Sequence, residues 1–305
     1  MEIGLIGLGR MGANMARRWA RAGTRVKAFD PAGPARAALA DEAGVSTVDG
    51  AAALVASLAA PRIVWLMVPA GEITARALDG LLPHLTRGDI VIDGGNAFYK
   101  DTLRRADTCG ARGVALVDVG VSGGVWGLAN GYGLMIGGPK EAVARVTPLL
   151  QQLAPAPDRG WVHCGATGAG HYAKMVHNGI EYGMMQALAE GLALLEAKRE
   201  FDFDLAAVAQ AWRDGTVIRS WLLDLTAEFL ARDAGLADVA PQVADSGEGR
   251  WTALEAIDLG VPAPVMSLAL MARFASQGQG DYGNKLLAMM RKGFGGHAVG
   301  RGEGR

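Results

Sequence analysis

The sequence predicts an N-terminal α/β domain followed by an all-α C-terminal domain. Three observations support this fold class. The first half alternates short apolar runs with helical stretches, strand signals nearly vanish after about Gly165, and the 305 residues are 50% hydrophobic. A chain of this length and composition can build two cores. We therefore expect an α/β domain at residues 1–165 and a helical domain at residues 166–305.

The expected strands are short runs rich in Val, Ile and Leu, at residues 2–7, 25–30, 62–68, 89–95, 114–120, 131–138 and 161–165. Apolar strands that alternate with helices indicate a parallel sheet covered on both faces. Between these strands, helical patterns occupy residues 12–22, 73–85 and 141–153. In the second half, apolar periodicity predicts one helix of about 30 residues. It is followed by shorter helices, so the helical segments are 171–199, 203–215, 219–233, 250–260 and 265–278.

Charge and cysteine content restrict the partners. The formal net charge is -1 and the basic residues are scattered, so we expect no nucleic-acid partner. Cys109 and Cys164 lie far apart and lack the spacing of a metal or redox motif. The apolar run at the N-terminus is short and interrupted by glycine, and no run reaches membrane-spanning length. We expect a cytoplasmic protein without a membrane partner.

The segment G-L-G-R-M-G follows the first strand and opens the first helix. Glycines at these positions permit a tight turn, close approach of a pyrophosphate to the backbone, and helix–strand packing. A simple strand-to-helix turn is the alternative. The context favours a dinucleotide fingerprint and hence a Rossmann-type domain. The residues expected to bind the cofactor are Gly7, Leu8, Gly9, Arg10, Met11 and Gly12.

Asp30 ends the second strand, 18 residues after Gly12. A carboxylate at this position accepts hydrogen bonds from the adenine ribose and repels a 2′-phosphate. The alternative is a turn or capping role in the D-P-A-G-P segment. We expect NAD as the cofactor, with weaker use of NADP because Arg10 offsets part of the selectivity.

Three further loops follow predicted strands: L-M-V-P-A-G, D-G-G-N-A-F-Y-K and D-V-G-V-S-G-G. Ligands of open α/β sheets bind at the carboxyl ends of the strands. Asn96 offers a donor and an acceptor, and Ser122, Gly123 and Gly124 offer a hydroxyl and exposed amides. One such loop is ordinarily a turn, but three beside a dinucleotide site indicate substrate binding.

A polar stripe lies on the predicted long helix. Lys174, His177, Asn178 and Glu181 occupy positions i, i+3, i+4 and i+7, which share one helix face. A solvated polar edge is the alternative. Glycines 179 and 183 destabilise a helix by about 1 kcal/mol each, which favours close approach of a ligand or another backbone. Lys174 is the candidate base, where burial or nearby positive charge favours its neutral form, and Glu181 is the candidate acid.

These motifs resemble 6-phosphogluconate dehydrogenase (decarboxylating) over nearly the whole chain. Within K-M-V-H-N-G-I-E-Y-G-M-M-Q, the run H-N-G-I-E-Y-G is the most specific part, and the resemblance continues in S-G-E-G-R-W-T and R-K-G-F-G-G-H. The chain is similar to the short, NAD-preferring bacterial type. The resemblance implies that 6-phospho-D-gluconate is oxidised and decarboxylated to D-ribulose 5-phosphate without a metal. Lys174 would take the C3 hydroxyl proton, and Glu181 would protonate the enediol at C1.

The resemblance also implies binding roles. Asn96 would touch both ligands, and Arg273 would hold the substrate phosphate. The remaining substrate positions are Ser122, Gly123, Gly124, His177, Asn178, Tyr182, Arg291 and His297, and a cofactor loop comprises Val68, Pro69 and Ala70. Arg291 and His297 would reach a neighbouring subunit's site, which implies a homodimer or homotetramer.

One departure concerns the phosphate. The larger enzymes carry a lysine 27 residues before the clamping arginine, where this chain has Ser246. A related non-phosphorylated sugar acid is therefore an alternative substrate, and a 3-hydroxyisobutyrate-type dehydrogenase is an alternative enzyme. His177, Asn178 and Glu181 together favour decarboxylation. A sensor that binds NAD without turnover is the third alternative, and the presence of both candidate proton-transfer groups argues against it.

Overall fold

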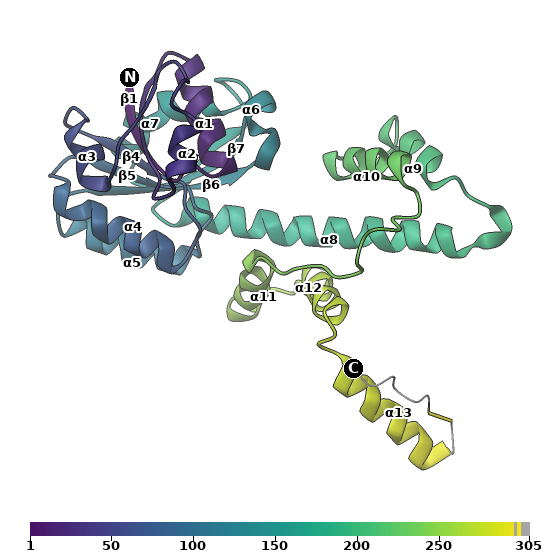
Figure 1. Cartoon of the computed structure of the whole chain (residues 1–305). Coiled ribbons are helices and arrows are strands. Elements are labelled where there is room, and N and C mark those ends of the chain that lie inside the picture. Colours follow the sequence, from purple (N-terminus) through teal and green to yellow (C-terminus); the bar gives the residue numbers. More distant parts are fainter. Residues whose placement is uncertain (296–297, 300–305) are drawn as a thin grey trace. The chain divides into compact units, whose positions relative to one another are not determined.

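A computed structural model of the chain describes residues 1–295 and 298–299, without the side chains of residues 294 and 295. The chain divides into two compact units, Met1–His177 and a second that begins at Asn178. The long helix α8 (Ala169–Ala197) runs through this division (Figure 1). No helix among the described residues is long and apolar enough to cross a membrane.

The first unit contains an eight-stranded sheet in the order β3-β2-β1-β4-β5-β6-β7-β8. The strands are β1 (Glu2–Ile6), β2 (Arg25–Phe29), β3 (Val45–Thr47), β4 (Ile63–Leu66), β5 (Ile90–Asp93), β6 (Ala115–Ser122), β7 (Gly133–Gly137) and β8 (Trp161–Gly165). All neighbours pair in parallel except β6 and β7. The order of the first six strands is that of dinucleotide-binding sheets.

The antiparallel strand β7 departs from the predicted parallel sheet. Ser122 of β6 pairs with Gly133 of β7, so the strands are joined by a short connection. That connection holds only η2 (Gly124–Trp126) and α6 (Gly127–Asn130). A parallel return requires a longer crossover, so a short connection produces an antiparallel neighbour.

Helices cover both faces of the sheet, as predicted (Figure 1). Strand residues alternate between two cores: Ile63 and Trp65 lie in one, and Val64 and Leu66 in the other. The first core includes α1 (Arg10–Arg21) and α7 (Lys140–Leu153). The second includes α3 (Ala51–Ala56), α4 (Glu72–Leu81) and α5 (Tyr99–Gly110).

Some boundaries differ from prediction. The helix expected at residues 73–85 ends as α4 at Leu81 and continues as the 3-10 turn η1 (Leu82–His84). Pro83 lacks the N–H that an α-helix needs, which explains the tighter turn. The sequence did not predict β3, which is three residues long, or α13 (Asp281–Gly295), whose sequence contains several glycines. The short helix α2 (Gly33–Ala37) follows β2.

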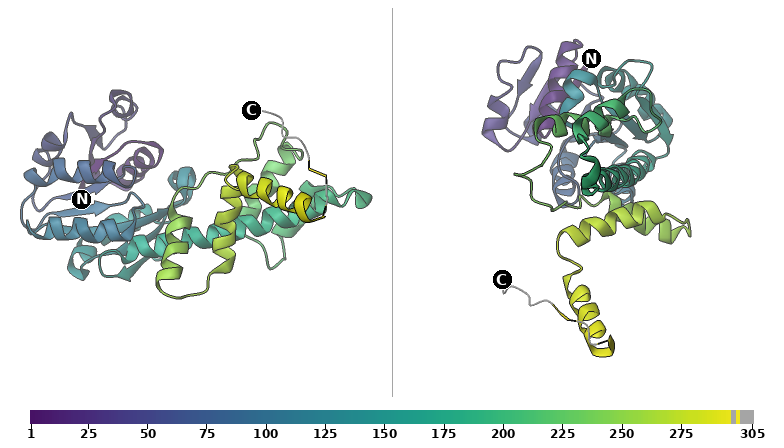
Figure 2. Two further views of the ribbon diagram at one scale, coloured as in Figure 1. Left: turned by 90° about the horizontal axis from the view of Figure 1, so that it is seen from below. Right: turned by 90° about the vertical axis from the view of Figure 1, so that its right-hand side faces the viewer.

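The second unit is helical, as predicted. It contains η3 (Arg199–Phe201), α9 (Leu205–Arg213), α10 (Trp221–Arg232), α11 (Glu248–Asp258), α12 (Pro264–Ser276) and α13. Helices α9 and α10 form one pair and α11 and α12 another (Figure 2). The side chains of Asp204 and Ser220 cap α9 and α10 by accepting backbone N–H groups. Each pair packs against α8 residues in a small core of its own.

Candidate active site

The three fingerprint glycines have different environments. Gly7 adopts a φ of +99°, which favours glycine. A Cβ on Gly12 would lie 1.9 Å from the Gly7 carbonyl oxygen, so only glycine allows α1 to pack this closely. A Cβ on Gly9 would meet no described atom within 4 Å, which leaves its backbone open to a ligand. These are the three roles that a dinucleotide turn requires.

The N-terminus of α1 suits a phosphate. Gly9 is its N-cap, no side chain of the described residues caps it, and its first turn holds no acid. Its amide groups and the helix dipole therefore favour an anion. Leu8 is buried, Met11 is half-buried and Arg10 is exposed at the start of the helix. The uncovered backbone of Gly9 and the uncapped N-terminus of α1 together fit a bound pyrophosphate.

Asp30 lies directly after β2 and braces this turn. Its Oδ2 accepts the Leu8 N–H at 2.7 Å, and its Oδ1 accepts the Ala32 N–H at 2.8 Å. Asp30 thus has the turn role weighed as an alternative, while each oxygen keeps a second lone pair for a ribose hydroxyl. Arg36 donates to the Asp30 backbone oxygen at 2.7 Å and pairs with Asp49 at 3.3 Å.

Two loops follow β4 and β5 at the same edge of the sheet. Val68 is half-buried, Pro69 and Ala70 are exposed, and Thr74 donates to the Pro69 carbonyl at 2.9 Å. Asn96 has a left-handed φ of 51°. Its amide donates to the Val121 carbonyl at 3.0 Å and accepts the Val121 N–H at 2.8 Å. Asn96 therefore ties the β5 end to β6, with one amide hydrogen left over.

The Ser122–Gly124 loop begins at the end of β6. Gly123 and Gly124 have φ values of 116° and 49°, which turn the chain sharply. A Cβ on Gly124 would meet no described atom within 4 Å. The exposed Gly124 and the half-buried Ser122 therefore present polar groups without a covering side chain.

Lys174 lies against the same strand and is only 5% exposed. A Cβ on Gly120 of β6 would lie 2.3 Å from the Lys174 Cβ, so the lysine stem fits because residue 120 is glycine. The Lys174 Nζ lies 3.4 Å from the His177 Nδ1. Burial disfavours a charged amine, which is the environment expected for a lysine base.

The first turn of α8 is held by two residues that the sequence did not single out. Asp118 of β6, 0% exposed, accepts the N–H groups of Gly168 and His171. His171, 1% exposed, bonds through Nδ1 to the Thr102 hydroxyl at 2.7 Å. An acid inside the apolar strand A-L-V-D-V-G-V was the available signal for Asp118.

The second unit gathers other predicted residues around Tyr182, which is 5% exposed. The Arg273 guanidinium stacks on its ring at 3.4 Å and donates to the Ala244 carbonyl at 2.8 Å. The Tyr182 hydroxyl bonds to Ser246 at 3.1 Å and to Asp245 at 3.3 Å. Tyr182, Arg273 and Ser246 are thus brought together.

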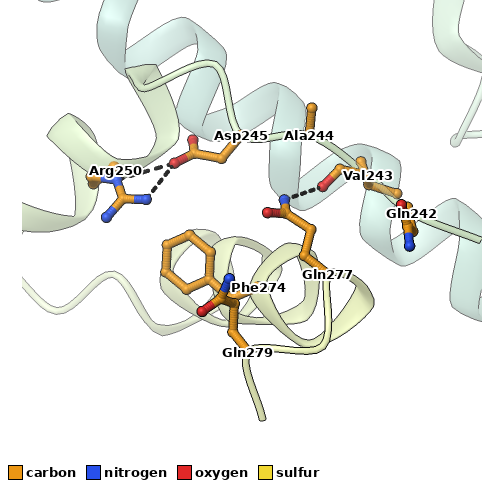
Figure 3. Close-up of a pocket in the computed structure, with 8 residues that line it drawn as sticks. All are labelled: Gln242, Val243, Ala244, Asp245, Arg250, Phe274, Gln277 and Gln279. Carbon is orange, nitrogen blue, oxygen red and sulfur yellow. Dashed lines mark hydrogen bonds and ion pairs between the residues drawn. The ribbon is translucent and has the colours of Figure 1, made fainter. Parts of the chain in front are cut away.

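A pocket beside this cluster has a volume of about 670 Å³, and Figure 3 shows Asp245 and Arg250 paired on its wall. Burial alone would raise the pKa of the Asp245 carboxyl. The Gly247 N–H, the Arg250 side chain and the Tyr182 hydroxyl outweigh this effect and lower that pKa. Ser246 also donates to Glu248 at 2.6 Å. Residues 245–250 therefore combine the acidic side chains of Asp245 and Glu248 with the basic side chain of Arg250.

The two stripe glycines are explained by helix packing. A Cβ on Gly179 would lie 2.6 Å from the Thr252 side chain of α11, and one on Gly183 would lie 3.3 Å from the Val265 side chain of α12. Close approach of neighbouring helices, rather than of a ligand, therefore accounts for both. Asn178 and Glu181 are half-buried on α8.

Arg291 is exposed on α13, and His297 lies outside the described residues. Within residues 1–295 and 298–299, no three His, Cys, Asp or Glu side chains are grouped to hold a metal ion.

The sheet order, the glycine turn and the helical second unit define a dinucleotide-binding dehydrogenase fold. Residues 2–167 match the NAD binding domain of 6-phosphogluconate dehydrogenase, and residues 170–297 match the C-terminal domain of that enzyme. The chain belongs to the 6-phosphogluconate dehydrogenase family.

Individual relatives agree. The chain is 45% identical over 302 residues, 99% of each chain, to a Haloferax volcanii protein named 6-phosphogluconate dehydrogenase, NAD(+)-dependent, decarboxylating. It is 39% identical to the Escherichia coli decarboxylating enzyme, covering 90% of this chain and 61% of that one. The Plasmodium falciparum 6-phosphogluconate dehydrogenase structure matches with a TM-score of 0.82 at 30% identity, over 100% of this chain and 67% of that chain. A Mycobacterium tuberculosis 3-hydroxyisobutyrate dehydrogenase shares the fold, with a TM-score of 0.73 at 24% identity over 92% of this chain and 94% of that chain.

Proposed function

We propose that this protein oxidises and decarboxylates 6-phospho-D-gluconate to D-ribulose 5-phosphate and CO2, with NAD as the hydride acceptor. The observation that carries the proposal is Lys174, buried against Gly120 on the strand that ends in the Ser122–Gly124 loop. The full-length similarity to the Haloferax volcanii enzyme supports the same reaction.

The cofactor is assigned to the first unit. The residues around Gly9 and the start of α1 would bind the pyrophosphate, and Asp30 the adenine ribose. Asp30 also favours NAD over NADP, because its negative charge repels a 2′-phosphate. The nearby Arg36 is already paired with Asp49, which reduces its use as a phosphate clamp. When bound, NAD supplies the hydride acceptor.

Lys174 and Glu181 divide the proton transfers. Neutral Lys174 takes the C3 hydroxyl proton as the C3 hydride leaves, which produces a 3-keto acid. Protonated Lys174 then donates its proton to the ketone oxygen while the bond between C1 and C2 of the substrate breaks and C1 departs as CO2. In the resulting enediol, Glu181 donates a proton to the former C2, which becomes C1 of ribulose 5-phosphate, and Lys174 takes back the proton from the hydroxyl on the former C3. The lysine and the glutamate supply every proton transfer in this scheme, which uses no metal.

The substrate would be held by Asn96, the Ser122–Gly124 loop, His177, Asn178 and Tyr182. Arg273 is the proposed phosphate clamp, because a guanidinium binds phosphate through two parallel hydrogen bonds. One observation favours a related non-phosphorylated sugar acid as a second candidate. Ser246 donates to the Glu248 carboxylate, whose negative charge disfavours a phosphate at that position.

The protein is also proposed to form a homodimer or homotetramer, with Arg291 and His297 near a neighbouring subunit's site. Large apolar side chains on α12 and α13 are exposed, among them Leu268 at 67% and Leu287 at 58%. Exposed apolar side chains on this scale indicate a protein interface. Light scattering tests the assembly, and a fully active monomer would contradict it.

Steady-state kinetics test the substrate and the cofactor together. We expect the highest kcat/KM with 6-phosphogluconate and NAD, one CO2 released per NADH, and no loss of rate with EDTA. Gluconate, 3-hydroxyisobutyrate and NADP are the comparisons. A preference for gluconate would support the second candidate. NADH formation without CO2 from every active substrate would overturn the decarboxylating assignment.

Replacing Glu181 with glutamine should separate hydride transfer from overall turnover. A positioned acid contributes a factor of about 10² to 10⁴, so overall turnover should fall by at least about 100-fold. Rapid mixing should still show a burst of NADH in the first turnover. Glu190→Gln, an exposed position further along α8, is the matched control. Equal loss of the burst and of turnover would argue against Glu181 as the enediol acid.

A further inference from the structure

A buried carboxylate connects the strand that ends in the substrate loop to the helix that carries the lysine. Asp118 is 0% exposed in the otherwise apolar strand β6. Its Oδ1 accepts the Gly168 N–H at 2.7 Å, and its Oδ2 accepts the His171 N–H at 2.9 Å. Both oxygens are therefore directed at the first turn of α8.

Two hydrogen bonds from Asp118 constrain the start of α8 more strongly than a single bond would. The first N–H groups of a helix lack partners within the helix, and a carboxylate satisfies them with strong, charge-assisted bonds. Because the two bonds reach residues three apart, they restrict both the position of α8 and its rotation about its own axis. The Thr102 hydroxyl on α5 adds a third anchor through the His171 Nδ1, at 2.7 Å.

The same strand determines where the lysine stem lies. Asp118, Gly120 and Ser122 alternate along β6 and share one face of the sheet. Asp118 holds the helix start, Gly120 leaves room for the Lys174 stem, and Ser122 begins the substrate loop. Backbone contact is close here, since a Cβ on Gly170 of α8 would lie 2.4 Å from the Met135 carbonyl oxygen.

We propose that Asp118 is a positioning residue that, through the first turn of α8, sets the Lys174 amine relative to the Ser122–Gly124 loop. This inference rests on the proposed role of Lys174 as the base. Asp118 lies four residues before Ser122, and His171 lies three before Lys174. A small rotation of α8 would therefore move the amine while the loop stays in place.

Asparagine is the sharpest replacement for Asp118. It has nearly the same shape, but it offers one acceptor and places an NH2 group against the second N–H donor. One of the two bonds is lost and two donors face each other. Asp118→Ser is the second variant, with a smaller side chain that accepts one bond and causes no such clash.

Asp89 provides a matched control at the opposite end of the sheet. It is also 0% exposed, and its carboxylate accepts the Arg62 N–H at 2.6 Å and the Thr86 N–H at 2.8 Å. It lies just before the start of β5, whereas the proposed site follows the strand ends. Asp89→Asn should reduce stability without changing the geometry around Lys174.

The test compares full-length Asp118→Asn, Asp118→Ser, Asp89→Asn and Lys174→Met, measured per folded molecule with 6-phosphogluconate and NAD. Misplacement of a catalytic group by about 1 Å can cost about 100-fold in rate. We expect kcat of both Asp118 variants to fall by about 10- to 100-fold, with KM for NAD changed by less than about twofold. The kinetic isotope effect with substrate deuterated at C3 should increase, because hydride transfer becomes rate-limiting. Asp89→Asn should change neither kcat nor the isotope effect.

The outcomes are separable. If Lys174→Met is inactive but kcat and the isotope effect of folded Asp118 variants match the wild type, the positioning role is wrong and the base assignment survives. If Lys174→Met retains turnover, Lys174 is not the base, and the positioning role falls with it; if the wild type does not turn over 6-phosphogluconate with NAD, the proposed function itself fails. Equal losses of kcat in Asp118→Asn and Asp89→Asn would reduce Asp118 to a general stabilising role and overturn the proposal.

Discussion

Lys174→Met is expected to lower kcat by about 10³-fold or more. Methionine has a similar length and no titratable group, so it can occupy the space beside Gly120 without accepting a proton. General base catalysis contributes a factor of about 10² to 10⁴, and loss of the ketone-polarising cation adds to it. Because Lys174 is only 5% exposed, no solvent base can easily replace it.

Single-turnover mixing with saturating NAD is the measurement for Lys174→Met. Hydride transfer itself should slow. The affinity for NAD should stay within about twofold of the wild type, since the proposed cofactor site is at the Gly9 turn and does not include Lys174. Lys140→Met, at the exposed start of α7, is the control for loss of a lysine. Turnover within about tenfold of the wild type would rule out Lys174 as the base.

Local patterns explain why much of the fold could be predicted. The glycine turn depends on backbone geometry between neighbouring residues, so Gly7, Gly9 and Gly12 are recognisable from their spacing together with their place between a predicted strand and a predicted helix. The stripe from Lys174 to Glu181 depends on helix periodicity, which is also local. Strand β3 is too short for such a pattern, and the glycines at positions 283, 293 and 295 lower the helix propensity of the α13 segment.

Contacts between distant segments could not be predicted. Asp118 and His171 are 53 residues apart, and nothing in local periodicity indicates that one caps the turn containing the other. Gly179 is a second residue whose contact with a distant segment could not be predicted. The sequence suggested close approach of a ligand or another backbone, and the Thr252 side chain of the neighbouring helix α11 lies there. A glycine in a helix indicates close contact but does not identify the neighbour.

Gly9→Ala and Gly12→Ala should separate cofactor binding from folding. Gly9 has a φ of -60°, which alanine adopts readily, and its Cβ would meet no described atom within 4 Å. We expect Gly9→Ala to lower the free energy of unfolding by no more than about 1 kcal/mol, because alanine is a poorer N-cap residue than glycine. Its methyl group would instead occupy the space proposed for the pyrophosphate, so NAD affinity should fall by about tenfold or more.

Gly12→Ala should act on the fold as well. Its Cβ would lie 1.9 Å from the Gly7 carbonyl oxygen, a backbone atom that cannot rotate away. Overpacking of this kind costs about 1–3 kcal/mol, so denaturant unfolding should shift and NAD binding should be lost with it. Calorimetric titration with NAD beside urea unfolding distinguishes the two variants. If Gly9→Ala binds NAD as tightly as the wild type, the pyrophosphate does not approach Gly9, and the open space there has another cause.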